Sequence, residues 1–326
     1  MKHVTRLILA ALICCPAYAA SDDARAVRDW LEKMITAEQY LNYEGTFIFI
    51  NGPKVETMQI VHGFDEKGER ERITLLTGVS KEVVRDEEHV FSVLPRKKQV
   101  LIQPRNHHAD AAGFLESVKN RNPWYEFELN GSERIADHYC KIISIFPRDQ
   151  FRYGYRLCIH NETGLLLKSQ TLDNSGQPVE QMIFTNLELP TSVPTEHLQT
   201  TMHEKDFELL QTTRSKKTDP ALRPDPAWRF TELPPGFKVA HNSMRRLAGV
   251  QTSVQHIVLD DGLATVSVFI APYDPNESYT EGVASSGALN AVSRLKNGYI
   301  VTVIGDVPEK TVKLIAGSLV HDTRVQ

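Results

Sequence analysis

CKIISIFPRDQFRYGYRLC, residues 140–158, is the stretch of the sequence that decides the fold. Two runs of alternating, β-rich residues flank the turn signal at 147–150, which predicts an antiparallel hairpin. A register centred on this turn places Cys140 directly opposite Cys158. Cα atoms at a non-hydrogen-bonded pair lie about 4.5 Å apart, a distance that a disulfide tolerates. We therefore predict a Cys140–Cys158 disulfide that contributes roughly 3 kcal/mol to stability.

The alternative interpretation of Cys158 is a reactive thiol with a histidine base. His138 or His160 would serve as that base. Two cysteines in register are better explained as partners, and we favour a structural role for both.

The N-terminus indicates the compartment. Lys2 and Arg6 precede an apolar stretch at 7–17 that is too short to span a bilayer, and residues 17–19 (AYA) form a small-residue cleavage site. These features predict a secretory signal peptide over 1–19 and a mature protein in the periplasm, where disulfides form. The formal net charge of −4 and an exported location both argue against a nucleic-acid partner.

The alternation of residues in the hairpin sorts its side chains by face. One face is continuous, apolar and aromatic, and it carries Ile143, Ile145, Tyr153, Tyr155, Leu157 and Ile159. The other face carries both cysteines with Ile142, Ser144, Phe146, Arg152, Gly154 and Arg156.

A second pair of strands, at 44–50 and 55–62, presents a similar face around the turn NGPK. We expect the two faces to line one apolar cavity sized for acyl chains, and an ordinary packed core is the alternative. The candidate lipid-binding residues are Phe47, Phe49, Met58, Ile60, Ile143, Ile145, Tyr153, Tyr155 and Leu157.

The order of elements predicts a mainly β (α+β) fold with two domains. An amphipathic helix over 21–40 comes first, and ten or eleven strands at hairpin spacing follow, interrupted by a short helix at 111–120 and closed by a possible helix near 196–210. This order favours a large unclosed antiparallel β-barrel, capped by helices, over residues 20–210.

A polar, proline-rich stretch at 211–225 reads as a linker. Beyond it, residues 226–326 predict a smaller antiparallel sheet with a helix at 309–319. Asp261-Gly262 and Asn297-Gly298 each lie between apolar runs and predict hairpin turns. Contacts between domains joined by such a linker are usually modest, so we expect the two domains to move relative to each other.

The motif search indicates binding rather than catalysis. The sequence has no G-x-S-x-G, H-E-x-x-H, P-loop, G-x-G-x-x-G or C-x-x-C pattern. We assign no catalytic residue, no metal ligand and no cofactor, and we expect the protein not to be an enzyme.

With these pieces placed, the chain resembles the MucB/RseB family of envelope-stress regulators. In the large domain the resemblance is carried by RYGYRL (152–157) and TGLLL (163–167). In the small domain it is carried by LPPGF (233–237), DGLA (261–264) with VSVF (266–269), and VTVIGDVP (301–308). Each motif alone is a strand-and-turn pattern, so the resemblance rests on their succession along the mature chain.

The resemblance implies a large domain like the lipoprotein-carrier fold and a regulatory function. Proteins of this family bind the periplasmic part of a membrane-spanning anti-sigma factor and shield it from proteolysis, and lipid or lipopolysaccharide fragments are thought to release them. The alternative function is a periplasmic carrier of lipids or lipoproteins, and a homo-oligomer is possible in either case. We expect the anti-sigma segment to bridge both domains, and lipid in the large domain to shift their arrangement.

Overall fold

The computed structural model describes residues 19–105, 122–201, 207–211, 223–246, 253–276 and 279–322. The predicted signal peptide, apart from its last residue, lies outside these residues, and so do the helix expected at 111–120 and most of the predicted linker.

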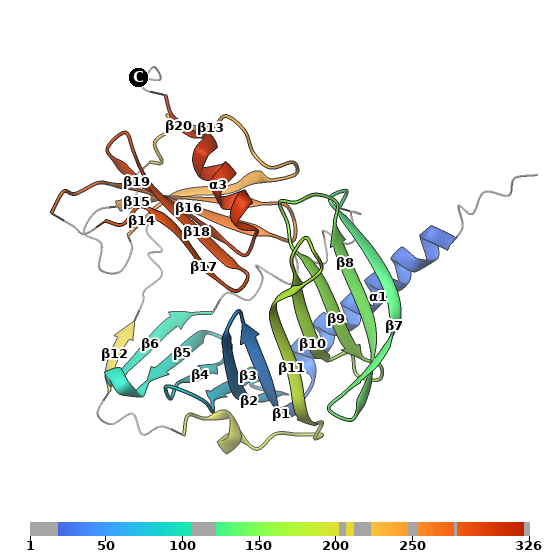
Figure 1. The fold of residues 1–326 in the computed structure, drawn as a ribbon. Helices are drawn as coiled ribbons and strands as arrows, with labels where there is room; N and C mark the ends of the chain where they lie inside the picture. The colour runs from blue at the N-terminus through green and yellow to red at the C-terminus, as the bar shows by residue number, and fades with distance from the viewer. Residues whose placement is uncertain are drawn as a thin grey trace, which may run out of the picture.

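The large domain is built on one twelve-stranded sheet (Figure 1). Its strands are β1 (Tyr43–Asn51), β2 (Lys54–Asp65), β3 (Gly68–Leu75), β4 (Glu82–Arg85), β5 (His89–Leu94), β6 (Gln99–Pro104), β7 (Tyr125–Ile135), β8 (His138–Pro147), β9 (Gly154–His160), β10 (Leu166–Leu172), β11 (Pro178–Glu188) and β12 (Glu208–Gln211). Their order is β12-β6-β5-β4-β3-β2-β1-β11-β10-β9-β8-β7, so β12 and β7 are the edge strands of the sheet among the described residues. The prediction of an unclosed, mainly antiparallel sheet is confirmed.

The helix expected near 196–210 is not formed within the described residues. A short 3-10 helix, η2 (Thr195–Leu198), is followed by β12, which pairs in parallel with β6. Leu198 is buried against the backbone of Gly63, and the backbone of residues 208–211 pairs with the edge of β6 instead of bonding within a helix. A second 3-10 helix, η1 (Pro95–Lys97), joins β5 to β6.

The first helix, α1 (Ala19–Tyr40), covers one face of the sheet. Val27, Leu31, Met34 and Ile35 recur at helical spacing and are buried. They form one packed cluster with Ile143, Ile145, Leu157 and Ile159 of β8 and β9. Among the described residues, no helix combines the length and the apolar composition needed to cross a membrane.

The register predicted for the β8–β9 hairpin is wrong by two residues. Cys140 lies opposite His160, and Cys158 lies opposite Ile142, because the loop between the strands runs from 148 to 153 rather than closing at 150. The longer loop arises because Arg152 leaves the strand to pair with Asp149 and with the small domain. A shift by an even number of residues leaves the paired residues, 140–145 and 155–160, on their predicted faces, whereas Arg152 and Tyr153 lie in the loop.

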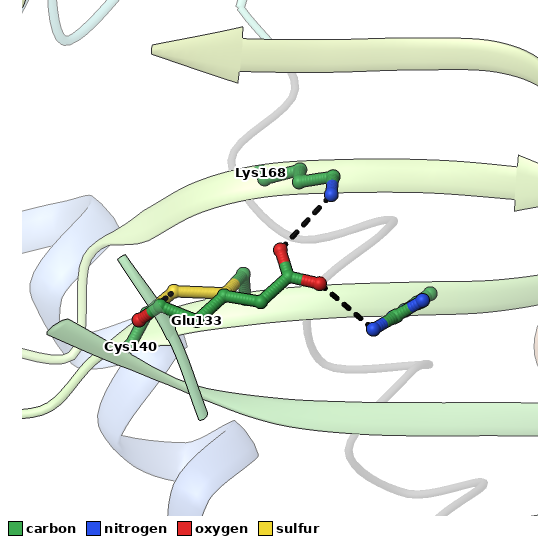
Figure 2. Close-up of a disulfide and its surroundings, with 5 residues drawn as sticks. Glu133, Cys140 and Lys168 are labelled. Carbon is green, nitrogen blue, oxygen red and sulfur yellow. Dashed lines mark hydrogen bonds and ion pairs between the residues drawn. A yellow bond between two sulfur atoms is a disulfide. The ribbon is translucent and has the colours of Figure 1, made fainter. Parts of the chain in front are cut away.

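The predicted disulfide is present despite the shift. Cys140 and Cys158 are bonded with their Cα atoms 5.3 Å apart, and both are buried. Above the bond, the Glu133 carboxylate accepts hydrogen bonds from Lys168 Nζ at 3.0 Å and Arg156 Nη2 at 2.7 Å. Figure 2 shows Glu133 extending over the disulfide toward Lys168.

The small domain contains a six-stranded antiparallel sheet and one helix. The sheet order is β14 (Lys238–Arg246), β15 (Ser253–Asp260), β16 (Thr265–Pro272), β19 (Tyr299–Gly305), β18 (Leu289–Lys296) and β17 (Gly282–Ser286). Helix α3 (Glu309–Ser318) buries Val312 and Ile315 against Val266 and Val303, and β13 (Trp228–Phe230) pairs with β20 (Leu319–His321). The predicted sheet with a closing helix is confirmed, and Asn297 and Gly298 both adopt positive φ, as their turn requires.

His256 lies on β15, on the sheet face opposite the core residue Ile257. Its ring stacks on Phe269 with centroids 4.4 Å apart, and its Nε2 lies 3.0 Å from Ser267 Oγ. Burial, together with nearby Arg245 and His241, lowers the pKa of His256 to about 4. The fold therefore favours the neutral imidazole.

This depressed pKa predicts a pH dependence. Because the folded pKa lies below the unfolded value of about 6.5, the stabilisation is complete above pH ~6.5 and is lost as pH falls toward 4. We expect the free energy of unfolding of the wild type to fall more over this range than that of His256→Gln. Urea titrations at pH 7.0, 5.5 and 4.0 measure the difference, with His197→Gln, at an exposed histidine of the large domain, as control. Parallel profiles for wild type and His256→Gln would contradict the prediction.

Candidate functional site

Eight of the nine candidate lipid-binding residues share one face of the large sheet. The register links them strand by strand: Phe49 lies opposite Met182, Met182 opposite Ser169, Ser169 opposite Leu157, and Leu157 opposite Ile143. Directly opposed residues point to the same side of a sheet. We call this side, which α1 also contacts, the inner face.

The part of the inner face beneath α1 is a packed core. Ile143 and Ile145 are fully buried, and Leu157 packs with them against the helix. The structure thus supports the alternative of an ordinary core for this part. Phe49, Met58 and Tyr155 are only partly buried, so the apolar inner face continues beyond these buried residues. Phe47 and Ile60 are buried beside Phe184 and Leu187.

The inner face turns polar at one end. Met58, Ile60 and His62 are alternate residues of β2, and His62 is buried against the ring of Tyr43, with centroids 4.9 Å apart. His62 Nδ1 lies 2.7 Å from the backbone oxygen of Leu41, and its Nε2 lies 3.4 Å from Glu69. This end of the face therefore consists of polar groups held by the end of α1 and by β3.

Two arginines complete this polar end. Arg105 pairs with Glu69 at 2.5 Å, and Arg85 pairs with Glu71 at 2.5 Å. Although burial opposes ionisation of Glu69, hydrogen bonds from His62 and Arg105 lower the pKa of Glu69. Burial raises the pKa of nearby Glu38 on α1. Local sequence does not predict this cluster, because Glu69 and Glu71 come beside His62 only once β2 and β3 are paired.

The ninth candidate, Tyr153, lies at the contact between the two domains. Strand β9 begins only at Gly154, and the Tyr153 hydroxyl accepts a hydrogen bond from Asn290 of the small domain at 3.0 Å. Its neighbour Phe151 accepts a hydrogen bond from Thr311, at the start of α3, at 2.8 Å. Residues 151–153 therefore dock the large domain onto the small one.

Arg152 is the centre of this contact. Its side chain is fully buried, and its Nε donates to the Asp261 carboxylate at 2.5 Å. Its two terminal nitrogens donate to Asp149 and to the backbone oxygen of Pro235. The guanidinium also lies against three aromatic rings, those of Trp124, Tyr125 and Phe237. Each of the three guanidinium nitrogens thus donates to an acceptor, and the two domains together supply these acceptors.

Asp261 is the partner from the small domain. One carboxylate oxygen accepts from the backbone nitrogens of Leu263 and Ala264, which fixes the turn, and the other accepts from Arg152 and from the Tyr125 hydroxyl. Its backbone oxygen accepts from Asn122 of the large domain at 2.7 Å. Sequence analysis found the turn at 261–262 but missed the ion pair, because no local pattern relates residue 152 to residue 261.

Close backbone contacts extend the junction on both sides. Gly236 has a φ of +83°, and a Cβ built there would lie 2.1 Å from Trp124 Nε1. Gly287 has a φ of +56°, and a Cβ there would lie 1.8 Å from Asn51 Oδ1 at the tip of the β1–β2 hairpin. Both positions therefore require glycine. A buried ion pair and two close contacts at glycines therefore join the domains, and how far the domains move relative to each other stays a prediction.

The junction predicts unequal effects for two arginines of one hairpin. Arg152→Ala leaves Asp261 buried without its charged partner, so we expect the free energy of unfolding to fall by about 3–5 kcal/mol. Arg156→Ala is the matched control, because Arg156 is 43% exposed and its pair with Glu133 is worth about 1 kcal/mol or less. Denaturant titration followed by tryptophan fluorescence measures both. Equal losses would show that the junction is not a special contact.

The comparisons with known proteins cover both domains. Residues 26–202 match the MucB/RseB N-terminal domain model, and residues 223–320 match the MucB/RseB C-terminal domain model. Among the described residues, no group of three or more His, Cys, Asp or Glu side chains is placed to hold a metal ion.

Similar proteins match over nearly their whole length. The sigma factor AlgU regulatory protein MucB of Pseudomonas aeruginosa is 31% identical over 98% of both chains, and the sigma-E factor regulatory protein RseB of Escherichia coli K12 is 26% identical over 89% of both. A chain of the solved P. aeruginosa MucA/MucB complex is 28% identical with a TM-score of 0.69, covering 91% of this chain and 99% of that one. A structure of MucB alone is 26% identical with a TM-score of 0.59, covering 91% and 98%. The chain belongs to the MucB/RseB family.

Proposed function

We propose that this protein is a periplasmic negative regulator of an envelope-stress sigma factor, which binds the periplasmic part of a membrane anti-sigma factor and protects it from proteolysis. The observation that carries the proposal is the match of both domains to family members whose names state sigma-factor regulation. Regulation of this kind requires a binding surface and no chemistry on the partner.

The arrangement of the two domains supports this proposal. The TM-scores to chains from two MucA/MucB complexes are 0.69 and 0.68, whereas the score to MucB alone is 0.59 at the same coverage of this chain. The identities differ little, between 26% and 28%, so the higher scores reflect geometry. The shape of the whole chain is thus closer to these partner-bound relatives than to MucB alone.

The inner face supports a second part of the proposal, that lipid or a lipopolysaccharide fragment releases the partner. Phe49, Met58 and Tyr155 are partly buried and adjoin Phe47, Ile60 and the packed residues beneath α1. An acyl chain bound against them would bury apolar surface, and each Å² removed from water contributes about 25 cal/mol to the free energy of binding. A carrier function uses the same face, but it gives no role to a small domain held by a buried ion pair.

The test titrates the mature chain, residues 20–326, with the periplasmic segment of the anti-sigma factor of the same organism. We expect saturable binding by calorimetry and slower digestion of the segment by a protease. Added lipid A should weaken binding by about tenfold or more, which corresponds to ~1.4 kcal/mol. Absence of any binding would contradict the regulatory function, and binding that lipid A does not change would contradict the release mechanism alone.

Two neighbouring substitutions locate the lipid effect. Phe49→Ser removes an inner-face ring, and Ile48→Ser is the matched control because residue 48 points to the opposite side of the same strand. We expect Phe49→Ser to reduce the effect of lipid A, while Ile48→Ser behaves like the wild type. Equal behaviour of both variants would place the lipid elsewhere.

A further inference from the structure

The free edges of the two large sheets differ in how they are protected. Natural edge strands avoid pairing with other chains by charge, bulges or short length. Strand β14 carries Lys238, Arg245 and a bulge near Val239, and β7 carries several glutamates and a bulge after Leu129. Within the described residues, strand β12 spans only Glu208–Gln211. Three of the four edges therefore show at least one protective feature.

Strand β17 has neither a charged residue nor a bulge to protect its edge. Its sequence is GVASS, it contains neither proline nor a charged residue, and its register with β18 is regular from Gly282 to Ser286. All five residues are exposed, and within the described residues no strand other than β18 pairs with it. As far as the described part of the chain shows, its outer backbone groups are open to a further strand.

The side chains of β17 favour an apolar addition. Val283 lies opposite Val292, which belongs to the core of the small domain, and yet Val283 is 44% exposed. The core face thus continues to the edge of the sheet and stops there without a neighbour. A strand added to β17 would place a side chain beside Val283 and complete this face.

The position of β17 limits what can be added. The strand lies on the side of the small domain that faces the large domain (Figure 1). At its end, Gly287 contacts Asn51 of the β1–β2 hairpin, and Asn290 on β18 binds Tyr153. The edge is therefore continuous with the inter-domain junction, and the chain's own large domain stands beside it. An extended segment fits such a place better than a second folded copy does.

We propose that β17 is a strand-addition site, and that an extended segment of the protein partner pairs with residues 282–286 and sets an apolar side chain against Val283. This inference rests on the proposed function, because it takes the periplasmic segment of the anti-sigma factor as the occupant. Backbone hydrogen bonds supply the affinity in this mode of recognition, and alternate side chains supply the specificity.

Proline substitutions in the mature chain, residues 20–326, test the pairing. Successive N–H groups of a strand point to opposite edges, so one of Val283→Pro and Ala284→Pro removes a donor from the free edge while sparing the β18 ladder. We expect that variant to keep the wild-type Tm and to bind the partner segment at least tenfold more weakly. Ala240→Pro is the matched control, since Ala240 is an exposed alanine on the other edge strand of the same sheet.

Hydrogen exchange on the wild-type chain gives a second reading that needs no variant. We expect the amides of residues 282–286 to exchange rapidly in the free protein and slowly once the partner segment is added. Protection already present in the free monomer would mean that a segment of this chain covers the edge, and a wild-type dimer that the proline variants dissociate would mean that a second copy does. Either result overturns the proposal.

The outcomes separate the two proposals. If the wild-type chain binds the segment and both proline variants bind it equally well, strand addition is wrong while the regulatory function stands. If the wild-type chain does not bind the segment at all, the regulatory function fails and strand addition fails with it.

Discussion

The ion pair between Arg152 and Asp261 is the interaction on which the arrangement of the molecule depends. Removing two charges from water costs several kcal/mol for each ion, and only complete hydrogen bonding offsets this cost. Here Asp149, Pro235 and three aromatic rings complete the surroundings of the guanidinium. A partly opened junction would leave a buried charge without a partner, so the contact is expected to be either closed or fully separated.

This constraint links the two surfaces for which we propose a function. The inner face lies on the sheet that contains β9, and residues 151–153, just before β9, bind the small domain. The free edge of β17 begins at the other end of the same junction, where Gly287 meets Asn51. A ligand that displaced α1 or the start of β9 would therefore act on the junction through a few directly bonded residues.

Local patterns predicted much of the fold and less of the site. Alternation and turn residues predicted the strands, the faces and the disulfide, because side-chain period and turn chemistry are local properties. The hairpin register was wrong because Arg152 is drawn out of the strand by Asp261, more than one hundred residues later in the chain. The helix expected near 196–210 was wrong at its end for a similar reason, since β12 finds its partner in β6. The polar end of the inner face and the junction both depend on pairings between distant segments.

We expect the Arg152 junction to hold the two domains as one body before any partner binds. Spin labels at Val55→Cys on β2 and Leu295→Cys on β18, both exposed positions, allow the inter-domain distance to be measured by pulsed electron resonance. If the Arg152–Asp261 ion pair keeps the junction closed, the free wild-type chain should give one narrow distance distribution and Arg152→Ala a broad one. A broad distribution in the free wild-type chain, unchanged by the substitution, would contradict it.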